Sequence, residues 1–172
     1  MQMVKRIVGG FFLFILLLWL FAPKQELYYL LEKKLKENDV IISNESLKDT
    51  WFGLNIQHAD IYVKGIKTAN VANLQLNIFF FYNTLKADNI QVNESFHNMA
   101  PKNIDELNVK YSVVDPLHIS LNSLGSFGTA TGAVNLKERK IDIGFPVAKD
   151  INTFKKFLKK DKTGGWKYET NY

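Results

Sequence analysis

The sequence predicts a mainly β protein, with a membrane-spanning helix and a short helix before an antiparallel sheet of about eight strands and a short amphipathic helix near the C-terminus. Three observations support this prediction. An apolar run lies close to the N-terminus, apolar and polar residues alternate with a period of two after residue 40, and short turns separate the alternating segments. No helical crossover of a dozen residues separates them, which argues against a parallel sheet.

The composition limits the classes of protein to consider. The 172 residues suffice for one domain, and 47% hydrophobic with 23% charged residues is typical of a folded chain. The lack of cysteine excludes a disulfide framework, a thiolate zinc site and a cysteine nucleophile. The net charge of +5 comes almost entirely from lysine and is modest.

The run Ile7–Ala22 contains no charged or polar side chain, and this predicts a membrane-spanning helix. A buried core helix would normally carry polar residues on one face. Lys5 and Arg6 precede the run, so the positive-inside rule places the N-terminus in the cytoplasm. Residues 1–22 are therefore predicted to be a cytoplasmic tip and a signal-anchor of a bacterial inner-membrane protein, with the bulk of the chain in the periplasm.

A cleaved signal peptide is the alternative to this anchor. Cleavage after Ala22 would place Leu20 at the −3 position and Pro23 at the +1 position, and both are poor for the signal peptidase. We therefore expect the span to stay attached to the mature chain.

Residues 23–39 predict a juxtamembrane helix. Leucines recur at three- to four-residue spacing, while Glu and Lys occupy the other face. A helix packed on the following domain is favoured over a coiled coil, since barely two heptads are present.

Residues 40–172 predict an extracytoplasmic antiparallel β domain, in which one sheet face is apolar and the other is rich in Asn, Gln and Lys. Residues 164–172 could add a last strand. The predicted strands are Leu54–Gln57, Asp60–Val63, Val71–Ile78, Asn89–Asn93, Leu107–Tyr111, Leu117–Leu121, Ala133–Leu136 and Lys140–Phe145.

Four consecutive aromatic residues break the alternation: Phe79, Phe80, Phe81 and Tyr82. One interpretation is a strand covered on both faces, or a loop packed beneath the sheet. The other is a patch that contacts a membrane or a partner protein. These four residues are therefore candidate contact residues.

Residues 150–160 predict a basic amphipathic helix with Asp150 as its N-cap. Such a helix either lies on anionic lipid or closes one end of the sheet, and we expect it to form a lid on the sheet. Its apolar stripe is Ile151, Phe154, Phe157 and Leu158, and the candidate lipid- or partner-contact residues in it are Phe154, Phe157, Lys155, Lys156, Lys159 and Lys160.

No motif points to catalysis. His58, His97 and His118 are far apart in the sequence, and none has a metal-ligand neighbour at helical or strand spacing. Nucleotide-binding, hydrolase and metalloprotease signatures are missing from the sequence as well. We therefore expect a protein that is not an enzyme, with no catalytic, cofactor-binding or metal site, and that does not bind nucleic acid.

Four features together resemble the GspN family of type II secretion systems and, more loosely, the AsmA-like envelope proteins. After the N-terminal anchor, the step Thr50–Gly53 precedes an alternating strand that ends at the Gly65 turn. The strand Val71–Ile78 then closes in aromatics, and Gly128–Leu136 leads into the last predicted hairpin. The resemblance implies a curved antiparallel sheet anchored in the inner membrane, without catalytic residues and accessory to a trans-envelope machine.

Two functions follow as expectations. The first is a scaffold of an envelope-spanning machine, similar to type II secretion, with other envelope proteins as partners; a flagellar motor or a pilus machine would fit equally well. The second is a lipid-binding module with an apolar groove. The two differ in the apolar sheet face, which a scaffold fills with its own side chains and a lipid carrier leaves open. We expect the scaffold.

Overall fold

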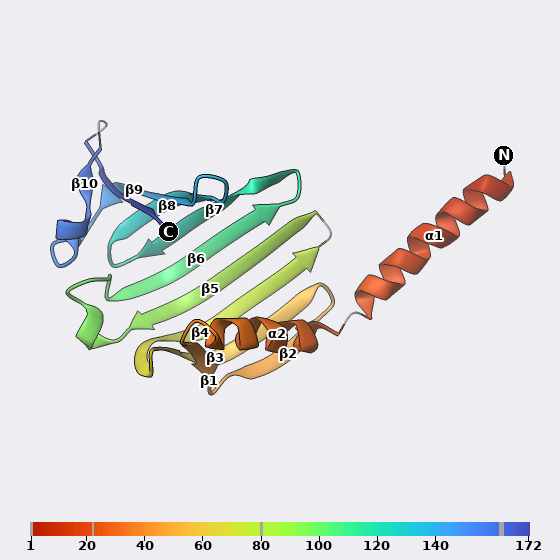
Figure 1. Ribbon diagram of the computed structural model, residues 1–172, viewed down its shortest axis with the longest axis horizontal. Coiled ribbons are helices and arrows are strands. Elements are labelled where there is room, and N and C mark those ends of the chain that lie inside the picture. The colour runs from red at the N-terminus through yellow and green to blue at the C-terminus, as the bar shows by residue number, and fades with distance from the viewer. Residues whose placement is uncertain (1, 22, 80, 162–163) are drawn as a thin grey trace.

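The computed structural model describes residues 2–21, 23–79, 81–161 and 164–172. It consists of two helices followed by a strongly curved β-sheet (Figure 1). The elements are α1 (Gln2–Leu20), α2 (Lys24–Lys36), β1 (Val40–Ser43), β2 (Ser46–Thr50), β3 (Gly53–Val63), β4 (Ile66–Phe79), β5 (Tyr82–Val92), η1 (Glu94–Phe96), β6 (Asn103–Ser112), β7 (Asp115–Gly125), β8 (Gly128–Asn135), β9 (Lys140–Ala148), η2 (Lys155–Phe157), β10 (Lys159–Lys160) and β11 (Trp166–Asn171).

All eleven strands of the described residues belong to one sheet, with antiparallel pairing throughout. The order is β1-β3-β4-β5-β6-β7-β8-β9-β11-β10, and β2 also pairs with β3. The antiparallel sheet predicted from the alternation is thus confirmed, but the expected number of about eight strands is wrong. The alternation did not reveal the short strands β1, β2 and β10, and it captured only the second half of β5.

The helix expected near the N-terminus is present as α1, which projects away from the sheet (Figure 1). In the described residues, no helix combines the length and the hydrophobicity needed to cross a membrane. The membrane-spanning part of the prediction therefore has no support in the structure. The large apolar side chains that α1 exposes are Met3, Val4, Ile7, Val8, Phe11, Phe12, Leu13, Phe14, Leu16 and Leu17.

Helix α2 packs on the apolar face of the sheet through Tyr28, which is only 3% exposed. Its ring joins a core cluster with Leu54 and Ile56 of β3. The Tyr28 hydroxyl donates a hydrogen bond to Glu45 Oε1 at 3.3 Å. Burial, followed by the nearby Glu45 carboxylate, raises the pKa of Tyr28 well above its usual range. The expected helix packed on the domain is therefore present.

A crease crosses four neighbouring strands at one level. In the first three strands, the residues on this crease are His58 of β3, Ala72 of β4 and Asn89 of β5, which lie opposite one another in the register of the sheet. His58 and Asn89 have positive φ angles of 58° and 53°. In β6 the crease continues as a register shift between Ile104 and Glu106. Bulge-like irregularities of this kind increase the local twist and bend a sheet.

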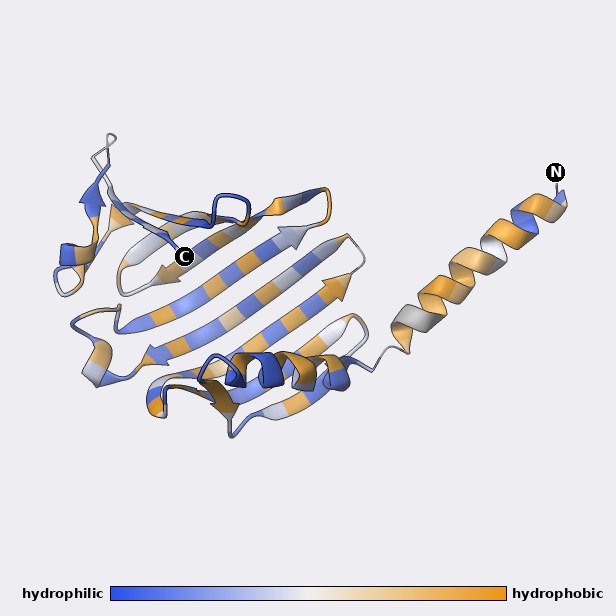
Figure 2. Cartoon of the chain, in the orientation of Figure 1, coloured by the Kyte–Doolittle hydropathy of each residue, from blue (hydrophilic) through white to orange (hydrophobic). Residues whose placement is uncertain are grey.

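The crease explains why simple alternation fails along these strands. In β4, Val71 and Leu74 both contact the core cluster although they are three residues apart. In β3, Ile56 and Ala59 likewise belong to the same cluster although they are three residues apart, so the alternation of inward and outward side chains shifts by one residue at the crease. A strict period of two would place one member of each pair on the polar face. The shift at the crease therefore keeps the same face of the sheet apolar on both sides of it. Figure 2 shows the alternation of hydrophobic and hydrophilic residues along these strands.

The predicted amphipathic helix near the C-terminus is wrong. Residues 152–154 form a turn, and only the single 3₁₀ turn η2 follows it. Asp150 has a φ of 30° and does not begin a helix. Ile151, Phe154 and Leu158 are nevertheless buried, and they pack in a second core cluster with Phe127, Ala130 and Phe145 of the sheet region. Phe157, expected in the same stripe, is 43% exposed.

Candidate functional site

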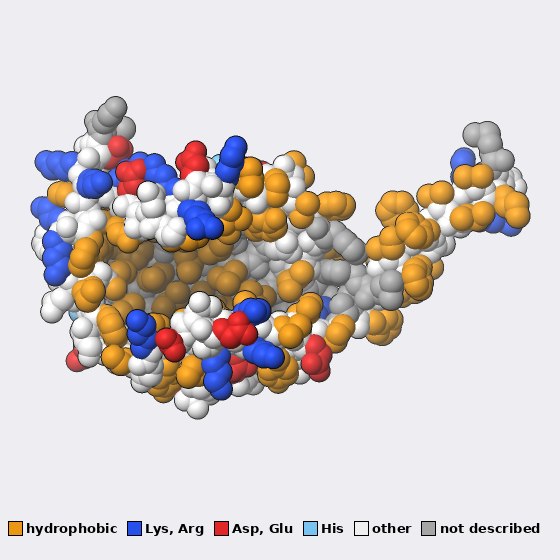
Figure 3. Space-filling model, in the orientation of Figure 1, with side chains coloured by type: hydrophobic (Ala, Val, Ile, Leu, Met, Phe, Trp, Pro, Cys, Tyr) orange, Lys and Arg blue, Asp and Glu red, His pale blue; other side chains and the backbone are white. Residues whose placement is uncertain are grey.

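The apolar face of the sheet forms a trough. The space-filling view shows a hollow between two rims, and hydrophobic side chains cover its floor (Figure 3). These side chains pack against the core clusters but stay partly accessible. They include Leu74, Leu76, Leu85, Ile104, Leu107 and Ile143.

The floor of the trough is continuous between the two core clusters. Ile104 of β6 packs against both of them. Helix α2 covers the first cluster through Tyr28, and the segment around η2 covers the second through Phe154. Each covers one part of the apolar face, so the stretch between them lacks a covering element within the described residues.

One end of the trough contains a pocket of about 350 Å³, which we call the distal pocket. Two connecting segments wall it: Met99–Pro101 after η1 and the region of η2. Strands β9 and β11 supply its base. The lining is almost wholly apolar: Met99, Ala100, Pro101, Ile143, Phe145, Phe154, Phe157, Leu158 and Tyr168.

The opposite end, which we call the proximal end, carries exposed apolar turns. Trp51 in the β2–β3 turn is 74% exposed, and Val114 in the β6–β7 turn is 86% exposed. The predicted contact residues lie in the β4–β5 turn between them: Phe79, Phe81 and Tyr82 are 47%, 64% and 46% exposed. The ring of Phe79 packs edge-on against that of Phe52, with 6.1 Å between the centroids. The prediction for Phe80 lies outside the described residues.

The four lysines predicted to contact lipid or a partner are all exposed. Lys155 Nζ lies 4.6 Å from the ring centroid of Trp166, and Lys156 Nζ lies 5.0 Å from that of Phe157; both are cation–π distances. Lys159 and Lys160 form β10 and pair with β11. The structure thus brings all four lysines to the distal end, away from the exposed aromatic turns.

The other face of the sheet is polar and is held by hydrogen bonds and ion pairs. Asp60 is only 7% exposed and accepts hydrogen bonds from Asn44 at 2.8 Å and Asn70 at 2.7 Å. Lys67 Nζ lies 2.7 Å from the same carboxylate. The bond from Lys67, followed by those from the two asparagines, lowers the pKa of Asp60 to about 2. This cluster links β3 to β4 on the polar face of the sheet.

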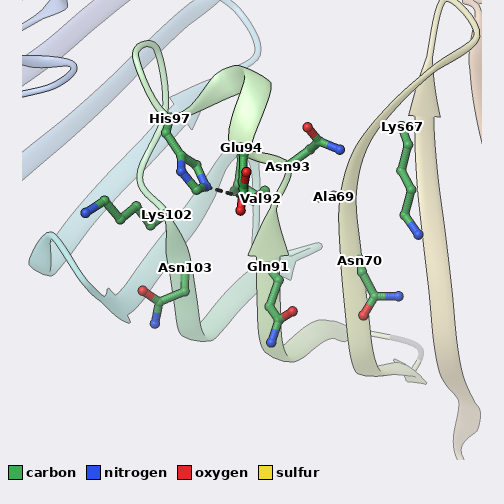
Figure 4. Close-up of a pocket in the computed structure, with 10 residues that line it drawn as sticks. All are labelled: Lys67, Ala69, Asn70, Gln91, Val92, Asn93, Glu94, His97, Lys102 and Asn103. Carbon is green, nitrogen blue, oxygen red and sulfur yellow. Dashed lines mark hydrogen bonds between the residues drawn. The ribbon is translucent and has the colours of Figure 1, made fainter.

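A polar hollow of about 570 Å³ lies beside this cluster (Figure 4). Asn70, Gln91 and Asn103 line it from three neighbouring strands. Its two lysines are already ion-paired, Lys67 with Asp60 and Lys102 with Asp150 at 3.7 Å. His97 Nε2 lies 2.9 Å from the carbonyl oxygen of Val92. With its cations neutralised, this hollow is a weaker candidate for a charged ligand than the trough is for an apolar one.

The histidines do not assemble into a site. His58 lies on the crease, His97 follows η1, and His118 in β7 lies 2.7 Å from Asp115 Oδ1. Across residues 2–21, 23–79, 81–161 and 164–172, no three His, Cys, Asp or Glu side chains lie close enough together to hold a metal ion.

Met99–Pro101 form one wall of the distal pocket, and no pattern in the sequence singles them out. These residues lie in a connection between strands, and their only signal is a short apolar stretch before a proline. The other wall is predictable, because the apolar stripe around Phe154 predicts a lid on the sheet.

Fold and site together define an open, curved antiparallel sheet with an apolar trough. The chain matches no known family model, no curated protein and no solved structure. The resemblance to the GspN and AsmA-like proteins therefore stays a prediction.

Proposed function

We propose that this protein binds the apolar chain of a lipid or a similar amphiphile in its trough, and that α1 holds it at a membrane. The observation that carries the proposal is the open hydrophobic floor between α2 and η2 (Figure 3). A hydrophobic surface of this extent is unfavourable in water, and a bound apolar chain would cover it.

The shape of the trough suits an extended chain. The trough runs along the strands from the proximal turns to the distal pocket. A strand rises about 3.3 Å per residue, so a strand of 11 residues such as β5 extends for about 36 Å. The distal pocket would receive the end of the chain, since its lining is apolar. A polar head group would stay at the open part of the trough. No step of this proposal requires catalysis.

The scaffold role expected from the sequence is the less favoured candidate. A scaffold would fill the apolar face with its own side chains, whereas Leu76, Leu85 and Leu107 stay partly accessible. A role in an envelope machine, with other envelope proteins as partners, is compatible with lipid binding and stays a prediction from the resemblance.

Photo-crosslinking tests the binding. The full-length protein in lipid nanodiscs is incubated with a palmitic acid that carries a diazirine group, irradiated and digested, and the adducts are located by mass spectrometry. We expect adducts on floor residues and in the distal pocket. Adducts spread evenly over both sheet faces would contradict the proposal.

A matched pair of variants makes this test specific. Leu107→Gln places an amide on the floor, and Lys110→Gln places the same group on an exposed position of the same strand. We expect Leu107→Gln to reduce crosslinking and Lys110→Gln to leave it unchanged. Equal crosslinking in both variants would argue that the probe does not occupy the trough.

Membrane attachment needs separate experiments. The exposed apolar side chains of α1 support insertion into lipid. Extraction with alkaline carbonate separates an embedded helix from one that only touches the surface. Alkaline phosphatase fused after Tyr172 reports on which side the sheet lies, and active enzyme would support the periplasmic location expected from Lys5 and Arg6. An inactive fusion would contradict that location.

A further inference from the structure

We propose that the proximal end of the trough lies against the membrane, with its apolar turns inserted into the lipid interface, so that the trough opens onto the bilayer. This inference deepens the proposed function and rests on it for the role of the trough. Its partner is a lipid bilayer rather than a protein.

The first argument is that three turns at this end share one character. They connect β2 to β3, β4 to β5 and β6 to β7, so they lie in sequence along one edge of the curved sheet (Figure 1). Their tips carry Trp51, Phe81 and Val114, which are 74%, 64% and 86% exposed. Trp and Tyr are enriched at membrane interfaces, and the neighbouring Phe and Val side chains gain free energy on leaving water.

The second argument is the contrast with the distal end. There the strand connections carry charged side chains, such as Lys64 in the β3–β4 turn, Glu94 in η1 and Lys149 after β9. Such side chains are costly to bury in a bilayer. At the proximal end the turn residues Trp51, Phe52, Val113 and Val114 are uncharged, and the acidic residues Asp49 and Asp115 lie in the flanking strands. The charged β8–β9 turn, Lys137–Arg139, belongs to the opposite rim of the trough. The end that can enter lipid is therefore the proximal end, along the rim of β3 to β7.

The third argument is the length of the tether. Helix α1 ends at Leu20 and α2 begins at Lys24, so four peptide steps join them. Fully extended, they reach at most about 14 Å. The C-terminal end of α2 lies at the distal end, where Lys64 N donates to Asp39 O at 2.8 Å. Helix α2 therefore begins towards the proximal end, and an α1 in lipid keeps that end close to the membrane (Figure 1).

The arrangement has a functional consequence. An apolar chain could pass from the bilayer into the trough along a continuous hydrophobic surface, from the aromatic turns over Leu76 to the floor. The chain would then avoid exposure to water, which is the main barrier to lipid extraction. The walls of the distal pocket would limit how far it enters.

The three tryptophans of the chain supply the test, since Trp51 lies at the proximal end, Trp166 at the distal end and Trp19 in α1. Three full-length variants each keep one tryptophan and replace the other two with Phe. Each is reconstituted in nanodiscs with or without brominated phospholipid, which quenches tryptophan only on contact. For the variant that keeps Trp51, we expect brominated lipid to reduce the emission, and we expect the emission maximum to lie at a shorter wavelength than that of Trp166. For the variant that keeps Trp166, we expect brominated lipid to leave the emission unchanged.

Equal quenching of Trp51 and Trp166 would overturn the inference, whether or not Trp19 is quenched. Quenching of Trp19 alone would mean that α1 inserts while the sheet stands away from the bilayer. The diazirine experiment keeps the two proposals apart, because adducts on the floor from soluble palmitic acid would uphold the trough even if Trp51 never meets lipid. The variant Val114→Asp should reduce the quenching of Trp51, and unchanged quenching would also count against insertion of this edge.

Discussion

Two phenylalanines three residues apart allow the stability of the distal pocket to be separated from its binding. Phe154 is 5% exposed and lies 6.2 Å from the ring of Phe145, centroid to centroid. Phe157 lines the same pocket but is 43% exposed. We expect Phe154→Ala to lower the free energy of unfolding by about 3–5 kcal/mol, as other buried Phe truncations do.

The expected cost of Phe157→Ala is smaller. Since nearly half of this residue is already accessible, the change removes only part of the transfer free energy of a Phe side chain, or about 1–2 kcal/mol. The cavity term is small as well, because the vacated space opens onto solvent and needs no collapse. The amphipathic helix expected from the sequence would have made the two costs equal.

The assay is urea unfolding of the full-length protein in nanodiscs, followed through Trp166 in a background with Trp19 and Trp51 replaced by Phe. Trp166 packs against the same cluster as Phe154 and therefore reports its loss. Diazirine crosslinking of the same proteins gives the second readout. Phe157→Ala should reduce adducts in the distal pocket while lowering the free energy of unfolding by only about 1–2 kcal/mol. Equal unfolding costs for the two variants would refute the assignment of one as core and the other as lining.

Three further predictions concern the body of the sheet. The folded-state pKa of Asp60 is about 2, against 3.8 for an unperturbed carboxyl group, so its contribution to stability is complete above about pH 5 and is lost as the pH falls towards 2. The Asp60→Asn variant should therefore lose less stability than the wild type over this pH range. An equal loss in both proteins would contradict the prediction. Gly128→Ala should destabilise the protein more than Gly65→Ala. Both glycines have positive φ, but a Cβ at Gly128 would lie 2.0 Å from the carbonyl oxygen of Val147 in β9, whereas a Cβ at Gly65 would meet no atom within 4 Å. Equal melting temperatures of the two variants would refute this close approach. Leu76→Ala should cost about 2 kcal/mol, at the low end for a leucine, and Gln75→Ala on the opposite face less than about 0.5 kcal/mol, as measured by urea unfolding; equal costs would mean that both faces are buried.

The period-two alternation determined the class of the fold. Segments such as Leu107–Tyr111 fall in strands as expected, and the turn at Lys64–Gly65 is where the sequence placed it. Local geometry is enough for such predictions, because successive side chains in a strand point to opposite faces. The two N-terminal helices were likewise predictable, α1 from its uninterrupted apolar run and α2 from its leucines at three- to four-residue spacing.

The sequence also singled out the aromatic residues of the β4–β5 turn, but not their role. Four aromatics in a row are compatible with a buried strand and with an exposed turn. Their exposure depends on where β4 ends, and that is set by pairing with β3 and β5. Trp51 and Val114 join them only because the antiparallel order of the sheet brings alternate turns to the same end.

The helix expected at residues 150–160 failed for a related reason. Ile151, Phe154 and Leu158 have the spacing of an amphipathic helix, but each packs into the second core cluster without one. Burial against Phe127 and Phe145 determines the backbone there, and tertiary contacts override a weak helical preference in so short a segment.

The sequence by itself therefore determined an antiparallel sheet with one apolar face and an apolar helix before it. Only the tertiary structure decided that this face stays open as a trough. The crease at His58, Ala72 and Asn89 keeps the face apolar across a change of phase and bends the sheet. Such a crease depends on the register between strands, because irregularities scattered along the chain align only when the strands are paired.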